Sequence, residues 1–137
     1  MFSEKELAYL RTRRLLRLAT VEPDGQPDVD AVSFEFDGEY FYIGGRVLQT
    51  SRKYKNVAAG NTRVSLIIDD EETHAPRGIK LHGVARIVQR TGSFGTTEYL
   101  AIRPMVSWHW GIEGPPVFKN GTFVPPKTIW PPLNPEE

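Results

Sequence analysis

The chain has 137 residues, of which 39% are apolar and 25% are charged, and its 17 lysines and arginines equal its 17 aspartates and glutamates. This composition is typical of one globular domain and excludes a disordered or fibrous chain. The absence of cysteine excludes disulfides, thiolate catalysis and cysteine-based metal sites. A net charge of zero argues against a nucleic-acid-binding protein, which is ordinarily basic.

The first expected element is a helix that runs to about residue 13. Ser3 and Glu6 have the spacing of a capping box, and Phe2 and Leu7 occupy the flanking positions of a hydrophobic staple. These start signals precede a run in which apolar residues recur at helical spacing. We therefore expect this helix to pack one face on the core.

The middle of the chain reads as short strands separated by turns and interrupted by one helix. Residues 23–25 (PDG) and 37–38 (DG) are turn signals, and residues 44–45 (GG) end the first group of strands. A helix is expected over residues 50–59, with Thr50 or Ser51 as its cap and residues 60–61 (GN) as its stop. The expected strands are residues 15–21, 28–36, 40–43, 63–68, 78–89 and 97–110.

Two of these strands carry breakers. Gly83 predicts a bend in the long fifth strand, and Pro104 restricts the sixth strand to an edge or a bulge. Residues 115–137 hold seven of the eleven prolines. We interpret this segment as an irregular tail held by Phe118, Phe123 and Trp130, not as a second domain.

Six strands linked mostly by hairpins predict a mainly β fold, a small closed antiparallel β-barrel. The interior of such a barrel is filled by side chains. Ligands are therefore expected on an outer face or between subunits.

Charge is segregated along the sequence. Seven acids and no base lie between Arg17 and Arg46, and the segment from Arg46 to Arg63, both included, has five bases and no acid. One interpretation is that these segments neutralise each other in the fold. The other is a local anion site, since residues 50–53 (TSRK) place hydroxyls and two cations at the start of the short helix.

The histidines and tryptophans give weaker signals. His74, His82 and His109 have no metal-ligand spacing, so we expect no metal site. Trp108 and Trp110 share one face of the sixth strand, because side chains repeat every two residues. They form either a core or interface patch, or an aromatic wall for a flat ligand.

The order of these features resembles the flavin/deazaflavin oxidoreductase family related to pyridoxamine 5′-phosphate oxidase, the split β-barrel proteins. The likeness covers residues 1–114, which we take as the cofactor-binding domain, and leaves residues 115–137 as the tail. The segments that carry it are residues 17–21, 23–27, 31–34, 51–53 with Asn56, 61–64, 77–79, 83–85, 102–104 and 106–108.

This resemblance implies a six-stranded antiparallel split β-barrel of the FMN-binding type, a homodimer with two sites at the interface, and either coenzyme F-420 or FMN as cofactor. It implies that Ser51 and Lys53 hold the cofactor phosphate with help from Arg46 or Arg52. The other cofactor-binding residues implied are Ser33, Asn56, Arg77, Gly78 and, from the partner chain, Trp108.

The implied function is hydride transfer between F-420 and an unsaturated small molecule. The alternatives are an FMN-dependent pyridoxamine-phosphate-oxidase-like enzyme and a non-catalytic binding protein. The cofactor carries the chemistry, so we assign no catalytic residue. Solvent or a nearby side chain can supply the proton, and Ser33, Tyr54 and His82 are the side-chain candidates.

The chain has no run of 18 apolar residues, and residues 1–6 are acidic with no apolar run behind them. We therefore expect no membrane span, no signal peptide and a cytoplasmic protein.

Overall fold

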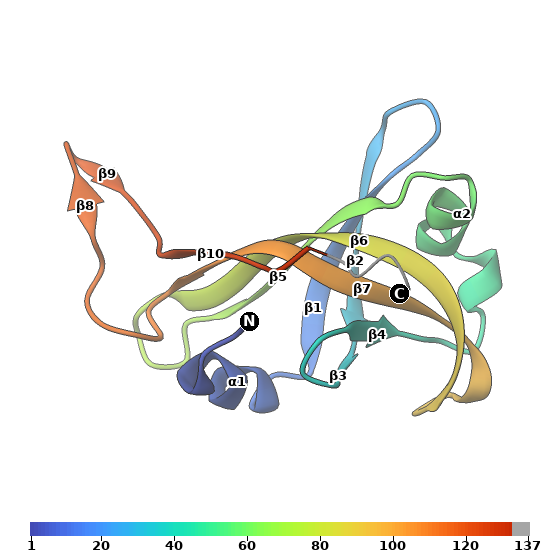
Figure 1. Ribbon diagram of the computed structural model, residues 1–137, viewed down its shortest axis with the longest axis horizontal. Coiled ribbons are helices and arrows are strands. Elements are labelled where there is room, and N and C mark those ends of the chain that lie inside the picture. Colours follow the sequence, from blue (N-terminus) through green and yellow to red (C-terminus); the bar gives the residue numbers. More distant parts are fainter. Residues whose placement is uncertain (133–137) are drawn as a thin grey trace.

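One eight-stranded antiparallel sheet makes up the body of the protein (Figure 1). The computed structural model describes residues 1–132. Its main strand order is β2-β1-β5-β6-β7-β4-β3, and β10 also pairs with β7. The bounds are β1 Leu15–Val21, β2 Pro27–Ser33, β3 Glu35–Phe36, β4 Phe41–Ile43, β5 Arg63–Asp70, β6 Arg77–Gly92, β7 Gly95–Trp110, β8 Phe118–Lys119, β9 Thr122–Phe123 and β10 Lys127–Ile129.

The sheet closes because the two ends of its main strand order are consecutive in the chain. Only Phe34 separates β2, which pairs with β1, from β3, which pairs with β4. The expected second strand of residues 28–36 is thus one continuous segment that pairs with β1 at one end of the strand order and with β4 at the other. With residues 27–36 counted as one strand and β10 left aside, the sheet has the six strands of the predicted split barrel.

The barrel interior is filled with apolar side chains. Alternation along the strands turns every second residue inward, as the burial pattern of β5 shows. The inward residues at most 2% exposed include Leu16, Leu18, Leu66, Ile68, Ile79, Leu81, Leu100 and Ile102. No room for a tricyclic ligand is left among them, as expected for a small barrel.

A β-bulge interrupts the pairing of β6 with β7, as Gly83 and Pro104 predicted. His82 pairs with Val106 and Gly83 pairs with Pro104, so Met105 is an extra residue on β7. A Cβ on Gly83 would lie 2.7 Å from the carbonyl oxygen of Arg103. Glycine is therefore required where the two backbones approach.

The two α-helices begin where the caps predicted. Helix α1 spans Glu4–Arg11 behind the complete Ser3–Glu6 capping box, two residues shorter than expected. Helix α2 spans Arg52–Ala58 behind the cap Ser51 and follows a short 3₁₀ turn, η1, over Leu48–Thr50. No helix among residues 1–132 combines the length and the apolar character needed to cross a membrane.

The tail is more ordered than the sequence indicated. Strand β10 adds to β7, and Trp130 is 3% exposed, with its ring 4.8 Å from that of Phe2. Trp130 therefore holds the tail, as expected. Phe118 and Phe123 do not, because they are exposed and contact each other in a β8–β9 hairpin that projects from the body (Figure 1). Residues 133–137, including Pro135, lie outside the described part.

Replacing Trp130 with alanine should destabilise the whole barrel. The side chain fills the core and its indole N–H donates a 2.9 Å hydrogen bond to Ser107. Loss of both should lower the free energy of unfolding by roughly 3–5 kcal/mol. Urea denaturation measures this, with Phe118→Ser as the control expected to change stability by less than about 0.5 kcal/mol. Equal effects of the two substitutions would contradict this account of the tail.

Candidate functional site

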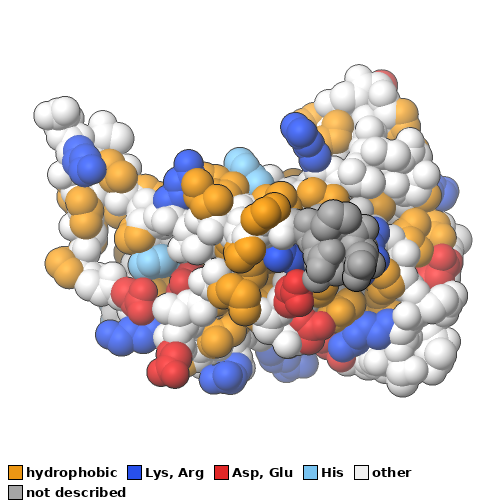
Figure 2. Space-filling view, viewed as in Figure 1, with side chains coloured by type: hydrophobic (Ala, Val, Ile, Leu, Met, Phe, Trp, Pro, Cys, Tyr) orange, Lys and Arg blue, Asp and Glu red, His pale blue; other side chains and the backbone are white. Residues whose placement is uncertain are grey.

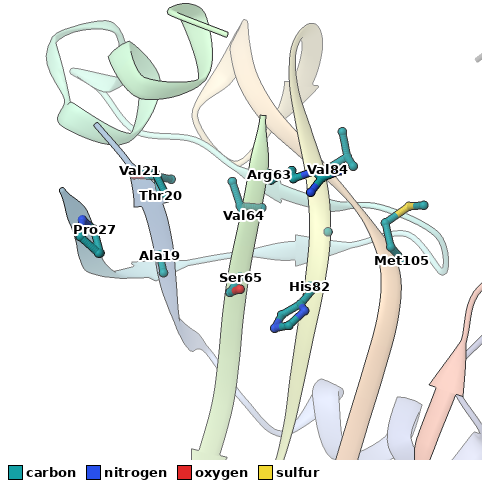
Figure 3. Close-up of a pocket in the computed structure, with 11 residues that line it drawn as sticks. Ala19, Thr20, Val21, Pro27, Arg63, Val64, Ser65, His82, Val84 and Met105 are labelled. Atoms are coloured by element: carbon teal, nitrogen blue, oxygen red, sulfur yellow. The ribbon is translucent and has the colours of Figure 1, made fainter. Parts of the chain in front are cut away.

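A groove of about 540 Å³ lies on the outer face of the sheet (Figure 3). Its floor contains outward side chains from three neighbouring strands: Ala19 of β1, Ser65 of β5 and His82 of β6. These residues are paired across the strands and lie side by side. The bulge residue Met105 bounds it on β7. The remaining lining residues are Thr20, Val21, Pro27, Arg63, Val64, Gly83 and Val84.

Trp108 adjoins this groove. Its indole packs edge-on against His82, with ring centroids 4.9 Å apart. Trp110 is on the same face and leans over Gly78, where a Cβ would come within 2.6 Å of the indole. Both indoles therefore share the outer face, where an interface patch and a wall for a flat ligand remain the alternatives, and Gly78 makes room for Trp110.

The basic residues at the start of α2 have acidic partners. Arg52 lies 2.6 Å from Glu22, and the Lys53 ammonium lies 3.5 Å from the Asp30 carboxylate and is 14% exposed. Both acids belong to the acidic stretch between Arg17 and Arg46. The interpretation in which the two charged segments neutralise each other is correct for these pairs.

Ser51 and Arg46 complete this region. The Ser51 hydroxyl caps α2 by accepting from the Tyr54 amide and donates to the carbonyl of Leu48 at 2.5 Å. Arg46 is exposed in the turn before η1 and forms no ion pair with a described residue. The long Lys53–Asp30 contact and the unpaired Arg46 leave donors available to an anion.

Asn56 has a packing role in the structure. It is 1% exposed and its side-chain amide donates a 2.9 Å hydrogen bond to Thr20. This bond fastens α2 to β1. The amide is committed inside the protein, so the expectation that Asn56 contacts the cofactor does not fit this arrangement.

Arg77 is likewise engaged away from the groove. Its guanidinium lies 2.9 Å from Asp70 and above the ring of Tyr9, whose hydroxyl donates to Asp70 at 2.6 Å. Burial favours the protonated form of Asp70, but the hydrogen bonds from Tyr9 and Arg77 outweigh it and hold the pKa of Asp70 well below its usual range. The cluster explains why β5 continues to Asp70 instead of ending at residue 68.

The predicted site residues thus fall in separate places. Ser51, Lys53, Arg52 and Arg46 gather around α2, and Trp108 and Gly78 share the outer face of β6 and β7. Ser33 is exposed at the end of β2 and lines a small hollow with Gly44 and Phe94.

Sequence reasoning missed two groups. Ser65 and Met105 line the groove, and only the alternation of their strands could have indicated their outward direction. Glu6, His109 and Glu113 bring possible ligand atoms within 4.8 Å of one another, and the buried Nδ1 of His109 has no partner. Spacing could not reveal this trio, because α1 and the end of β7 are distant in sequence.

Comparison with known proteins identifies the family. The pyridoxamine 5′-phosphate oxidase family model matches residues 2–123. A 5a,11a-dehydrotetracycline/5a,11a-dehydrooxytetracycline reductase from Streptomyces rimosus is 38% identical over 122 residues, which cover 82% of this chain and 85% of that protein.

Solved structures agree with this match. An F420 reductase is 28% identical with a TM-score of 0.56, covering 69% of this chain and 88% of its own. A general stress protein 26 from Bacillus anthracis is 16% identical with a TM-score of 0.66, covering 80% and 94%, and supports the fold alone. The chain belongs to the pyridoxamine 5′-phosphate oxidase family of split β-barrel proteins. It is an oxidoreductase of that family.

Replacing Asp70 with asparagine should destabilise the protein most near neutral pH. The pKa of Asp70 is lower in the folded than in the unfolded state, so its carboxylate stabilises the fold above the ordinary aspartate value of about 4. That contribution, roughly 2–3 kcal/mol, is lost as the pH falls below about 4. Denaturation of both forms from pH 7 to pH 3 measures it. If the difference in unfolding free energy between the wild type and Asp70→Asn stays constant over this range, the role given to ionised Asp70 is refuted.

Proposed function

We propose that the protein transfers a hydride between coenzyme F-420 and a flat, unsaturated small molecule. The observation that carries this proposal is the open groove beside Trp108, since a filled barrel leaves a planar ligand only an outer surface. The similarity to a dehydrotetracycline reductase and to an F420 reductase supports this reaction over the FMN-dependent alternative.

The residues present fit a cofactor of this kind. The groove volume of about 540 Å³ lies within the usual range of ligand sites. Lys53 and Ser51, with Arg46 or Arg52, would hold the phosphate, because an ammonium with three donors keeps capacity beside the 3.5 Å contact to Asp30. When bound, a deazaflavin supplies a hydride and not single electrons.

The chain itself contributes binding, orientation and a proton. Reduction of a carbon–carbon double bond needs a hydride at one carbon and a proton at the other. Of the three proton-donor candidates, His82 lines the groove. Tyr54 instead donates to Glu98 at 3.0 Å, which raises the pKa of its hydroxyl, and Ser33 lies at the end of β2. His82 is therefore the favoured source of the proton.

The same outer face would be shared with a second copy. Leu15, Val29 and Ile129 are 50%, 64% and 74% exposed on β1, β2 and β10. Exposed apolar side chains on one face of a sheet are typical of an interface. A homodimer that covers this face would bring the separate groups around α2 and Trp108 together between two chains.

Titration with F-420 and with FMN, followed by turnover, tests the proposal. We expect tighter binding of F-420 and reduction of 5a,11a-dehydrotetracycline or related conjugated ketones by the reduced coenzyme. Lys53→Ala should weaken cofactor binding about tenfold to a hundredfold, the effect of one charge-assisted contact. Lys55→Ala, one helical position beyond Tyr54 and exposed, is the matched control.

The alternatives give different results in the same experiment. Preference for FMN with oxidase activity would favour the FMN-dependent enzyme. Cofactor binding without turnover of any unsaturated compound would favour the binding protein. Unchanged affinity in Lys53→Ala would remove the phosphate role of that residue.

Light scattering tests the dimer. Two chains of 15.5 kDa should give about 31 kDa. Val29→Arg should shift the mass toward a monomer and weaken cofactor binding, because a charge would enter the apolar face. Thr73→Arg, in the exposed turn after β5, adds the same charge as a control and should leave the dimer intact. A wild-type monomer that binds cofactor at micromolar concentration would contradict the interface site.

A further inference from the structure

Three side chains form a row across the outer face of the sheet, next to the groove. Trp108 on β7 pairs with Lys80 on β6 on one side and with Lys127 on β10 on the other. The Lys80 ammonium lies 4.7 Å and the Lys127 ammonium 6.0 Å from the centre of the indole. The indole is thus flanked by a cation from each neighbouring strand.

Neither lysine is neutralised by the part of the chain that the structure describes. Arg17 and Lys53 are paired with Asp69 and Asp30. Lys80 and Lys127 are exposed and form no ion pair with any residue of 1–132. Two cations beside one aromatic ring, with no acidic side chain to neutralise them, favour the binding of an anion from solution.

The groove adjoins this row, so one ligand can occupy the groove and place an anionic group at the row. His82 links the two, since it lines the groove and packs on Trp108. The neighbouring row of paired residues on this face is the one that contains His82. It is more apolar, because it also contains Ala19, Val106 and Ile129. Figure 2 shows the surface hollowed between the β8–β9 hairpin and the end that carries α2, with basic side chains along the hollow.

We propose that Lys80 and Lys127 bind the ionised acidic group, a carboxylate or enolate, of a flat conjugated substrate whose ring system packs on Trp108. The proposal rests on the proposed function and narrows its substrate class to acidic polycyclic or aromatic compounds. Lys127 lies beyond residues 2–123, which match the family model. The tail therefore adds a selective contact that the family barrel does not supply.

The row is assigned to the substrate because, within one chain, it lies apart from the bases proposed for the cofactor phosphate (Figure 1). The bases proposed for the phosphate surround α2, which packs on β1 through Asn56 and Thr20. Figure 1 places α2 and the β8–β9 hairpin at opposite ends of the molecule, with the start of β10 on the side of the hairpin.

Binding of two matched probes tests the proposal without any cofactor. Isothermal calorimetry on the full chain compares 2-naphthoate with neutral 2-naphthamide, which share the ring system. We expect the carboxylate to bind at least tenfold more tightly in low salt, and the preference to shrink in 0.5 M salt. Lys80→Gln and Lys127→Gln should each reduce the preference at least threefold, and the double variant should abolish it.

Two controls make the result specific. Lys119→Gln removes an exposed lysine of the β8–β9 hairpin and should leave the preference unchanged. Lys80→Arg and Lys127→Arg keep the charge and should retain it. All substituted positions are exposed, so thermal melts should coincide with that of the wild type.

The outcomes separate this inference from the proposed function. Equal affinity for the two probes, or an unchanged preference in the double variant, would overturn the anion site. A double variant that binds F-420 at least tenfold more weakly but still prefers the carboxylate probe would assign the lysines to the cofactor and overturn the inference. A lysine-dependent preference in a protein that fails to reduce any substrate with F-420 would leave the anion site standing and refute the reaction.

Discussion

Closure of the sheet through a single residue is the constraint on which the molecule depends. Because Phe34 alone joins β2 to β3, the chain cannot open into a flat sheet without losing the pairing at one end. Closure turns the apolar residues inward and fills the interior. The groove, Trp108 and His82 all lie on the outer face.

A second constraint is the electrostatic balance around α2. Its cations are paired with acids of the β1–β2 segment, so the helix is held in place before any ligand arrives. In the proposed site a phosphate would compete with Asp30, which holds the Lys53 ammonium in place. By contrast, Lys80 and Lys127 carry their charge without an acidic partner on the described chain.

Local patterns predicted the elements well, and pairings between distant residues poorly. The Ser3–Glu6 box, the glycine turns and the bulge at Pro104 follow from neighbours in sequence, so their positions could be read directly. The burial of Asn56 against Thr20 and the capture of Arg77 by Asp70 depend on which elements meet. A family pattern gave both residues a role at the cofactor, and the structure shows the Asn56 amide bonded to Thr20 and the Arg77 guanidinium paired with Asp70.

The extra residue in β7 decides which way the end of that strand faces. Before the bulge, Leu100 and Ile102 point into the core, whereas after it the odd-numbered Ser107 and His109 are buried and Trp108 and Trp110 lie outside. One residue of length therefore reverses the two sides of a strand. A lineage that lost Met105 would bury two indoles and expose a serine and a histidine, so ligand preference here can change through chain length without any exchange of side chains.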